Sequence, residues 1–391
     1  MNINPQVQSS GPTRIRHLNR KAVLSYIREQ GPNSRSQLGR ALSLSGAAMT
    51  SVVNELLDNG LLRESENTRR DGRQGRPISL LELNPESACA LGIVLSPTSK
   101  STVLGMAFVD YTGQVTTLPE IQVDTIADLD ALIAQIEQAI TILKQAVPDR
   151  KRIAGVTLAI PGVVENENIP MSPKLRCIEG TAFMDRMKQM VNYPVNFCND
   201  VNLAAISELY QQPRLRNLSF AYLYLYSGVG SSIAIKGKLL TGSRGWAGEI
   251  GPLHINRRAP GSASFENLLS TDGSLAELLQ SLGHPRQALD KLADYIDQRH
   301  CGVLEVIDHY CEHVCDAINV LNSVLDVDEI LIEVRSETLF QRLRPRLEIL
   351  LQSAPRQPVL SAPVLGKQAA LNGAAISALN LALDDIEVAA K

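Results

Sequence analysis

Between residues 17 and 58, apolar positions recur at the spacing of amphipathic helices in three successive segments. The pattern predicts a first helix from about His17 to Glu29 and a short second helix that opens at Ser34. A polar turn, Ser43–Ser45, separates the second helix from a third, which is expected from about Gly46 to Asp58. Two short helices joined by a tight turn, with another helix as the third wall of a small core, are typical of a helix-turn-helix.

The outward face of the third predicted helix carries small and hydrogen-bonding side chains, which would let the helix approach base edges and phosphates closely. A helix that only covered a core would usually carry glutamate and lysine there. An ordinary helical hairpin is the alternative interpretation of the segment. The residues expected to contact DNA from the second and third helices are Arg35, Ser36, Gln37, Ser45, Ala47, Ala48, Thr50, Ser51 and Asn54.

The following segment has two apolar runs around a tip rich in glycine and arginine. Leu61-Leu62 and the run from Pro77 to Leu83 flank this tip, which predicts a β-hairpin wing. Guanidinium groups suit phosphates and the narrow, negative minor groove of A·T-rich DNA. Taken alone, such a run also fits a flexible cationic linker. Because it follows a helix-turn-helix, we expect it to grip the DNA through Arg73, Gln74 and Arg76.

The distribution of charge separates the predicted DNA-binding segment from the rest of the chain. Residues 1–86 hold 12 basic and 8 acidic residues, a balance of +4, whereas the rest of the chain has a balance of −7. The net charge of −3 therefore hides a basic amino-terminal module. Such a module fits a DNA-binding head on an acidic sensor body.

Length and composition narrow the class of protein. A chain of 391 residues is long enough for two or three domains. No apolar run reaches the length of a membrane span, the amino terminus lacks a signal-peptide core, and residues 1–12 are expected to be a disordered lead-in. Six cysteines at irregular spacing do not suggest a disulfide framework, so we expect a reducing cytoplasm. A single tryptophan argues against a stacking surface for single-stranded nucleic acid.

From Cys89 onward, strands and helices alternate. Two successive α/β units of this kind imply two packed lobes that hold a ligand between them. The expected strands are Leu91–Leu95, Val103–Val109, Ile153–Ile160, Val195–Cys198, Ala221–Tyr226, Ile233–Ile235 and Ile330–Val334. The expected helices are Ile126–Ala146, Thr181–Met190, Val201–Tyr210 and Val303–Leu321.

Three motifs in this body carry a family resemblance. They are Asn-Asp-Val-Asn-Leu-Ala-Ala at 199–205, Gly-Trp-Ala-Gly-Glu-Ile-Gly at 245–251 and Leu-Asn-Gly-Ala-Ala at 371–375. With the predicted winged helix, they make the chain resemble the ROK family of repressors and sugar kinases, and within it the NagC- and Mlc-like sugar-responsive repressors. The resemblance spans the chain from about residue 14 to 380.

This resemblance implies an α/β protein in which a winged helix-turn-helix at 13–84 precedes a two-lobed, actin-like body. The small lobe is expected at 85–200 and the large lobe at 201–391, with the C-terminal helix returning to the small lobe. A homodimer or homotetramer is implied as well.

Candidate ligand residues follow from the same resemblance. In ROK sugar kinases, the aspartate of an Asn-Asp pair is the general base on the sugar hydroxyl, and Asn199 and Asp200 match that pair. Glu249 and Glu266 match two further sugar-contacting positions. A carboxylate and an amide at a strand end offer acceptors and donors for paired hydroxyls. The alternative role for Asn199-Asp200 is that of a helix N-cap, and one of the two could serve both purposes.

Departures from the family pattern argue against catalysis. Where the family's first phosphate loop reads Asp-x-Gly-x-Thr, this chain has Val94-Leu95-Ser96-Pro97-Thr98. Where paired glycines usually face the nucleotide, it has Val334-Arg335. Without a metal-orienting acid and glycine cradles, phosphoryl transfer loses its main electrostatic support. Gly228-Val229-Gly230 keeps a phosphate-loop pattern, but a lone Gly-x-Gly is more often a hairpin corner. We therefore expect an inactive body in which Asp200 is vestigial.

No metal or cofactor is expected. Family members usually hold zinc with a histidine after Gly-Glu-Ile-Gly and three cysteines, whereas here Pro252 replaces the histidine and no cysteine follows before Glu266. His254 alone cannot make a four-ligand site. His309 and His313 fit a His-x-x-Glu-His pattern found in some zinc proteases. The apolar stripe of the surrounding segment favours a structural helix with Cys311 and Cys315 in the core.

The sequence thus predicts a DNA-binding transcriptional regulator, a repressor of carbohydrate-related genes, with a catalytically inactive sensor body. As a symmetric oligomer it should bind a palindromic operator. Two alternatives stay open: a ROK sugar kinase with an added module, and a regulator controlled by a protein partner in place of a sugar or sugar phosphate. No insertion into a membrane is expected.

Overall fold

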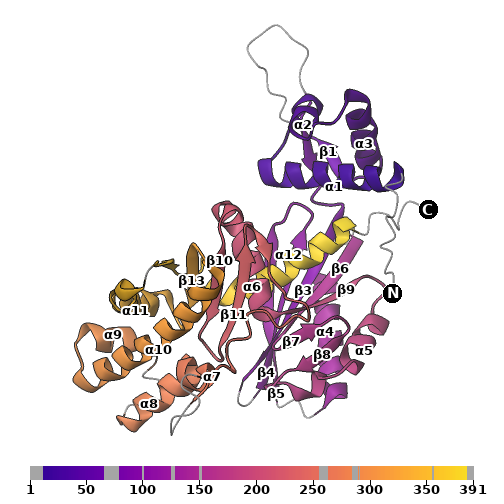
Figure 1. Ribbon diagram of the computed structural model, residues 1–391. Coiled ribbons are helices and arrows are strands. Elements are labelled where there is room, and N and C mark those ends of the chain that lie inside the picture. Colours follow the sequence, from indigo (N-terminus) through magenta and orange to yellow (C-terminus); the bar gives the residue numbers. More distant parts are fainter. Residues whose placement is uncertain are drawn as a thin grey trace, which may run out of the picture.

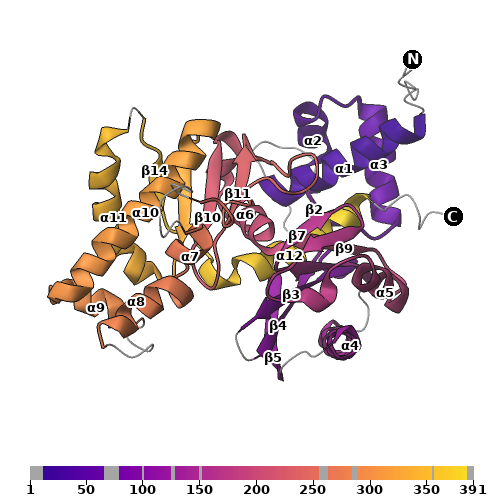
Figure 2. The ribbon, with the colours of Figure 1, turned by 60° about the horizontal axis from the view of Figure 1, so that its bottom comes forward.

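The computed structural model describes residues 12–65, 79–98, 101–124, 128–148, 152–254, 263–283, 289, 291–354 and 356–384. A small helical module lies above a larger body made of two lobes (Figure 1). A second view shows the two lobes side by side, with the last helix running between them (Figure 2). The predicted α/β class, with a winged helix-turn-helix before a two-lobed actin-like body, is confirmed.

The amino-terminal module consists of three helices and a short hairpin. Helix α3 begins and ends where the sequence predicted, whereas α1 begins earlier than predicted. The hairpin strands pair antiparallel, with Leu62 opposite Leu83. The wing tip at 66–78, including Arg73, Gln74 and Arg76, lies outside the described residues, as do residues 1–11 of the lead-in expected at 1–12, whereas Pro12 begins α1. The elements are α1 (Pro12–Gln30), α2 (Arg35–Ala41), α3 (Gly46–Asp58), β1 (Leu62–Glu64) and β2 (Leu81–Leu83).

The first lobe is built on a five-stranded sheet in the order β5-β4-β3-β6-β9. Its first three strands form an antiparallel meander, and β6 and β9 then add in parallel. A two-stranded hairpin, β7–β8, and two helices complete the lobe. The elements are β3 (Ala88–Pro97), β4 (Ser101–Asp110), β5 (Val115–Asp124), α4 (Leu129–Ala146), β6 (Arg152–Ile160), β7 (Val163–Glu165), β8 (Asn168–Met171), α5 (Ala182–Met190) and β9 (Val195–Asn199).

The second lobe repeats this topology, in the order β12-β11-β10-β13-β14. Again an antiparallel meander is followed by two parallel strands. The sequence pattern did not predict β14, α11 or the β7–β8 hairpin. The elements are α6 (Asp200–Gln211), β10 (Phe220–Tyr224), β11 (Gly230–Ile235), β12 (Lys238–Leu239), α7 (Phe265–Leu269), α8 (Ala276–Ser281), α9 (Leu292–Asp297), α10 (Cys301–Leu325), β13 (Glu329–Glu333), α11 (Glu337–Leu350), β14 (Val359–Ser361) and α12 (Ala369–Asp384).

Alternation along the central strands decides which helices cover which face. On β3, Leu91 and Ile93 face the cluster that α4 and α5 complete, whereas Ala90 and Val94 face α12. On β10, Leu223 faces α10 and α11, whereas Tyr222 faces α6. The body therefore has five layers, with α6 and α12 between the two sheets.

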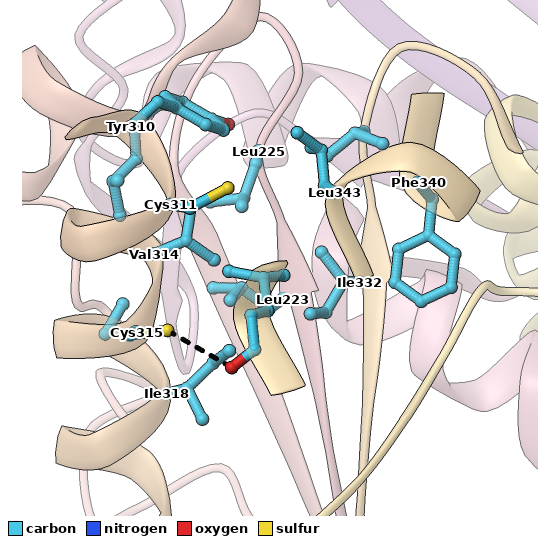
Figure 3. Packing of buried hydrophobic residues seen from close by; sticks show 14 of the residues in the cluster. Leu223, Leu225, Tyr310, Cys311, Val314, Cys315, Ile318, Ile332, Phe340 and Leu343 are labelled. Carbon is cyan, nitrogen blue, oxygen red and sulfur yellow. Dashed lines mark hydrogen bonds between the residues drawn. The ribbon is translucent and has the colours of Figure 1, made fainter. Parts of the chain in front are cut away.

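The outer layer of the second lobe contains two of the cysteines. Cys311 and Cys315 point from α10 toward β10 and β13, among Val314, Ile318 and Leu223 (Figure 3). The thiol of Cys315 donates to the carbonyl of Leu347 on α11 at 3.8 Å. The prediction that these two cysteines are core residues is confirmed.

The two central helices approach closely because of glycines. A Cβ atom on Gly373 of α12 would lie 1.9 Å from the carbonyl oxygen of Leu203 on α6. A Cβ atom on Gly92 of β3 would lie 2.6 Å from the backbone nitrogen of Ala375. Helix α12 thus packs backbone to backbone against both α6 and the first sheet.

Candidate DNA-binding surface and ligand site

Helix α2 is held by a capping box. The Ser34 hydroxyl accepts from the backbone N–H of Gln37 at 3.3 Å, and the Gln37 side-chain oxygen accepts from the N–H of Ser34 at 2.9 Å. This reciprocal pattern satisfies two N–H groups that a helix start leaves open. Gln37, which the sequence places among the DNA contacts, therefore also fixes α2, while Arg35 and Ser36 lie beside it in the first turn.

Helix α3 presents the face that the sequence predicted. Ser45 caps it by accepting from the N–H of Ala48 at 3.3 Å, and Thr50 donates to the carbonyl of Gly46 at 2.8 Å. The opposite face is buried through Met49, Val52, Val53 and Leu56. The predicted contact residues on this helix and its cap are exposed, apart from the half-buried Ala48: Ser45, Ala47, Thr50, Ser51 and Asn54.

Contacts within the module fix the orientation of α3. Arg20 of α1 is buried and pairs with Glu55 of α3 at 2.5 Å. The link between α1 and α2 pairs with the wing, because the backbone of Asn33 exchanges hydrogen bonds with Leu81. The exposed face of α3 is therefore held by both α1 and the hairpin.

Two arginines outside the predicted contact set are also exposed on the module. Arg40 is exposed at the end of α2, and its Nε donates to the carbonyl of Ser36 at 3.3 Å. Arg63 on β1 pairs with Glu82 at 2.7 Å. Since α3 itself carries no lysine or arginine, Arg40 supplies cationic charge near it. Its position one helical turn after Ser36 was the signal available in the sequence.

The candidate ligand site begins where β9 ends and α6 starts. Asn199 is the N-cap of α6: its side-chain oxygen accepts from the N–H of Asn202 at 2.9 Å, and its amide donates to the carbonyl of Gly162 at 3.1 Å. Asp200 accepts from the N–H of Val201 at 2.9 Å. The capping alternative thus holds for Asn199, whereas Asp200 occupies the first position of the helix.

Glu266 and a lysine meet at the corner between β10 and β11. Glu266 accepts from the N–H of Val229 at 2.8 Å, and Nζ of Lys174 lies 4.0 Å from the same carboxylate. Lys174 also donates to the carbonyl of Ser227. A Cβ atom on Gly228 would lie 2.7 Å from this Nζ, so a larger residue there would displace the end of the lysine side chain. The sequence analysis missed Lys174, because no local pattern connects it to residues 228–266.

Glu249 is positioned by a turn that requires glycine at the preceding residue. Gly248 has a φ of +91°, and a Cβ atom there would lie 2.2 Å from the carbonyl oxygen of Ser231. Only glycine accepts this conformation and this approach. Ser231 donates its hydroxyl to the carbonyl of Gly248 at 2.7 Å, which fixes the Gly-Glu-Ile-Gly segment against β11.

Electrostatics connect the carboxylates at this site. Burial, with the charges of Asp200 and Glu266, raises the pKa of Glu249 from 4.5 to about 7. Burial raises the pKa of Asp200 from 3.8 to about 6, partly offset by the hydrogen bond from Val201 and the charge of Lys174. The structure therefore brings together Asp200, Glu249, Glu266 and Lys174, with Asn199 beside them. Such a set can accept and donate hydrogen bonds to a polyhydroxyl ligand.

These raised pKa values predict how stability depends on pH. Between the ordinary carboxyl pKa and about 7, the folded protein binds more protons than the unfolded chain. The free energy of unfolding should therefore fall as pH rises across that interval. The Asp200→Asn, Glu249→Gln double variant should show a shallower fall in denaturant titrations at pH values from about 4 to 7. A residual slope is expected from Glu333, whose pKa burial raises to about 7. Equal slopes for variant and parent would contradict this assignment.

Val94 and Arg335, which stand where the family has nucleotide-binding residues, both pack against other side chains. Val94 is buried against α12. Arg335 pairs with Asp272 at 2.6 Å, and its guanidinium carbon lies 5.8 Å from the ring centroid of Tyr226. Lys367 lies over the same ring at 4.8 Å. As predicted, the Gly228–Gly230 segment is the corner of the β10–β11 hairpin.

The residues around Pro252 do not fit the family's zinc site. His254 pairs with Ser264 in an isolated bridge, and no group of three or more His, Cys, Asp or Glu side chains able to hold a metal occurs among the described residues. In the same part of the chain, no helix combines the length and apolar character needed to cross a membrane.

The DNA-binding module contacts the body at the end of α1. Arg28 donates to the carbonyl of Tyr111 at 3.3 Å, and Glu29 pairs with Arg216 at 3.0 Å. Tyr210, near the end of α6, donates to the carbonyl of Thr112 at 3.5 Å. One hydrophobic cluster continues from the module through Tyr111 into α12. Helix α6 therefore has ligand-site residues at its start. Its end, about 15 Å away at 1.5 Å per residue, is bonded to Thr112 and, through Leu209, to Arg216, which lie beside or form the contacts with the module.

Comparison with known proteins shows which family has this arrangement. A model described as the ROK family matches residues 106–380. A protein named xylose repressor from Staphylococcus xylosus is 25% identical over 376 residues, covering 94% of this chain and 95% of that protein.

Solved structures share the fold. A ROK family transcriptional regulator described as a homologue of the Escherichia coli MLC protein has a TM-score of 0.77 at 21% identity, covering 94% of this chain and 98% of that one. A ROK family glucokinase from Streptomyces griseus, solved with glucose and AMPPNP, has a TM-score of 0.63 at 18% identity, covering 75% of this chain and 100% of the kinase. The regulator match thus extends over a larger share of this chain than the kinase match.

Proposed function

Because the chain belongs to the ROK family, we propose that it is a DNA-binding repressor of carbohydrate-related genes with a ligand-sensing, non-catalytic body. The observation that carries the proposal is the fusion of a winged helix-turn-helix, with an exposed face of small residues on α3, to a duplicated two-lobed body. A relative that matches along nearly its whole length is named a repressor.

In this proposal, α3 enters the major groove. Thr50, Ser51 and Asn54 face base edges, and Ser45, Ala47 and Ala48 allow a close approach to the backbone. Arg35, Ser36 and Gln37 contact phosphates from the start of α2, with Arg40 beside them. The wing residues Arg73, Gln74 and Arg76 reach the minor groove. A two-fold symmetric oligomer places two such modules on a palindromic operator.

The body binds its effector through Asn199, Asp200, Glu249 and Glu266, joined by Lys174. A sugar presents paired hydroxyls that suit these groups. Catalysis is absent because Val94 stands where the family places a metal-orienting acid, and the Arg335–Asp272 pair on Tyr226 stands where it places glycines. This supports a sensor that keeps the sugar-binding residues of a kinase site but lacks the residues that bind the nucleotide and its metal ion.

Selection of duplex DNA from a random pool by the purified full chain tests the function. We expect a palindromic sequence whose half-sites are separated by whole helical turns, and release of that DNA by one member of a panel of hexoses, pentoses, amino sugars and their phosphates. Failure to retain any duplex at modest salt would remove the proposal. Phosphate transfer from ATP to the same panel, abolished by Asp200→Asn, would favour the kinase alternative.

Helix α6 supplies the link between the two functions in this proposal. A ligand that shifts Asn199 or Asp200 moves the start of a rigid helix. The far end of the helix bonds to Thr112 through Tyr210. Arg216, which follows the helix, pairs with Glu29 and transmits the displacement to α1. Allosteric coupling requires such an element that both sites bias.

Arg216→Ala should therefore weaken the effect of the sugar on DNA affinity, but not the binding of DNA by the ligand-free protein. We expect the DNA affinity of the ligand-free variant to stay within about three-fold of the parent. The ratio of affinities without and with the effective sugar should fall about five-fold or more. Fluorescence anisotropy with labelled operator measures both. Arg344→Ala, which removes a surface pair on α11, is the matched control and should respond as the parent does. An unchanged ratio in Arg216→Ala would exclude this route.

A further inference from the structure

Two histidines on the outer side of α10 face each other at close range. Nε2 of His309 and Nε2 of His313 are 3.2 Å apart, and the ring centroids are 4.5 Å apart with an interplanar angle of 68°. Residues four apart on a helix share one face. The opposite face of the same turns carries Cys311 and Cys315 into the core (Figure 3), so the two imidazoles project from the face of α10 that points away from that core.

Each imidazole has a carboxylate near its other nitrogen, within hydrogen-bond distance at His309 and beyond it at His313, whose Nδ1 is buried without a hydrogen-bond partner. Oε2 of Glu312 lies 3.2 Å from Nδ1 of His309, and Oδ2 of Asp316 lies 3.6 Å from Nδ1 of His313. An ionised carboxylate only accepts hydrogen bonds, so it favours the tautomer with hydrogen on Nδ1. When both rings carry their hydrogen on Nδ1, toward the carboxylates, the two Nε2 atoms are acceptors that point at one another, and a cation between them would relieve this opposition.

We propose that His309 and His313 form a bidentate site for a divalent transition metal ion of the zinc, nickel or copper class. Two metal–nitrogen bonds of about 2.1 Å, at angles between tetrahedral and square, place the nitrogens about 3.0–3.4 Å apart. The observed separation of 3.2 Å falls in that interval. Imidazole is a suitable ligand for these ions. A carboxylate hydrogen-bonded to the outer nitrogen is the usual support of a metal-binding histidine, and Glu312 supplies it to His309.

The charge around the pair also favours a cation. Asp308, Glu312 and Asp316 lie within the same two turns of α10, and Arg346 of α11, which reaches Asp308 at 2.9 Å, neutralises one of them. The side chain of His309 is 62% exposed and that of His313 20% exposed, so water can fill the remaining coordination positions. The sequence alone favoured a purely structural helix with no metal, and this geometry changes that interpretation for the exposed face.

Calorimetric titration of the metal-free full chain with zinc tests the site. We expect one ion per chain. We expect at least a ten-fold loss of affinity in His309→Asn and in His313→Asn, with unchanged circular dichroism. Glu312→Gln keeps both imidazoles and should weaken binding less. His254→Gln removes a histidine outside α10 and should leave the affinity unchanged.

Copper provides a second readout that does not depend on affinity. The electron paramagnetic resonance spectrum of the one-to-one Cu²⁺ complex should show coupling to two nitrogen nuclei, reduced to one in either single variant. Undiminished zinc binding in the double variant would overturn the proposal. So would a parent protein that binds neither ion, because a proton shared between the two rings would then account for their approach.

Discussion

Replacing Ser51 with glutamate is expected to lower operator affinity at least about 100-fold, or about 2.7 kcal/mol, while the protein stays folded. Ser51 is exposed on α3 between the buried positions of Met49 and Val52, so a longer side chain meets solvent and not core. On DNA, the substitution removes one contact and places a carboxylate against a surface of phosphates and base acceptors. A good base contact contributes about 1–3 kcal/mol, and the repulsion adds to its loss.

Two matched variants separate the causes. Ser51→Ala removes the hydroxyl without adding charge and should cost no more than the contact itself. Gln138→Glu makes the same change of net charge on an exposed position of α4, in the first lobe, and should leave the affinity unchanged. Anisotropy titrations with the selected operator, at one fixed salt concentration, compare all three. If the Ser51→Glu variant bound the operator as tightly as the parent, α3 would not be the DNA-recognition helix.

Gly373→Ala should destabilise the body by about 3 kcal/mol or more, at the upper end of the cost of overpacking a core. The added methyl group would lie 1.9 Å from the carbonyl oxygen of Leu203 and 2.5 Å from its carbonyl carbon. Both atoms belong to the backbone, so the clash cannot be relieved by a change of side-chain rotamer. It can be relieved only if α6 and α12 move apart. The midpoint of chemical unfolding of the body, followed by circular dichroism, measures the effect.

Gly302→Ala is the control for this variant. Gly302 also lies in a helix, but its added Cβ would meet only the side chain of Leu282, at 3.6 Å. Alanine loses less backbone entropy than glycine in a helix, so this variant should be stabilised by about 0.5–1 kcal/mol. Equal midpoints for the two variants would mean that the contact between α6 and α12 is not tight.

The amino-terminal module could be predicted closely because its signals are local. Ser45 before α3 and Asn59-Gly60 after it cap and end the helix, and the apolar spacing between them specifies its buried face. Seven strands of the body, β3, β4, β6, β9, β10, β11 and β13, were also identified, since buried runs such as Ile153–Ile160 have few alternative structures. Helix α11 was missed because Pro345 interrupts its pattern.

The candidate ligand site could be predicted only in part. Asn199, Asp200, Glu249 and Glu266 were selected through the family resemblance, not through any spacing between them. Lys174 was missed because it reaches Glu266 only after two distant segments have folded together. The contact of Arg28 with Tyr111 was missed for the same reason, since 83 residues separate them. Local patterns predict elements, whereas pairings across lobes depend on tertiary packing.

Helix α12 has a consequence for synthesis of the protein. Its residues come after all the strands of both sheets, yet Gly373 and Ala375 pack against α6 and β3, which are made much earlier. While a ribosome is still translating, the winged module can fold as soon as β2 emerges, but the face of the first sheet that packs against α12 stays uncovered until this last helix leaves the exit tunnel. A nascent chain stalled before residue 369 would therefore present a finished DNA-binding head attached to an aggregation-prone, half-covered body.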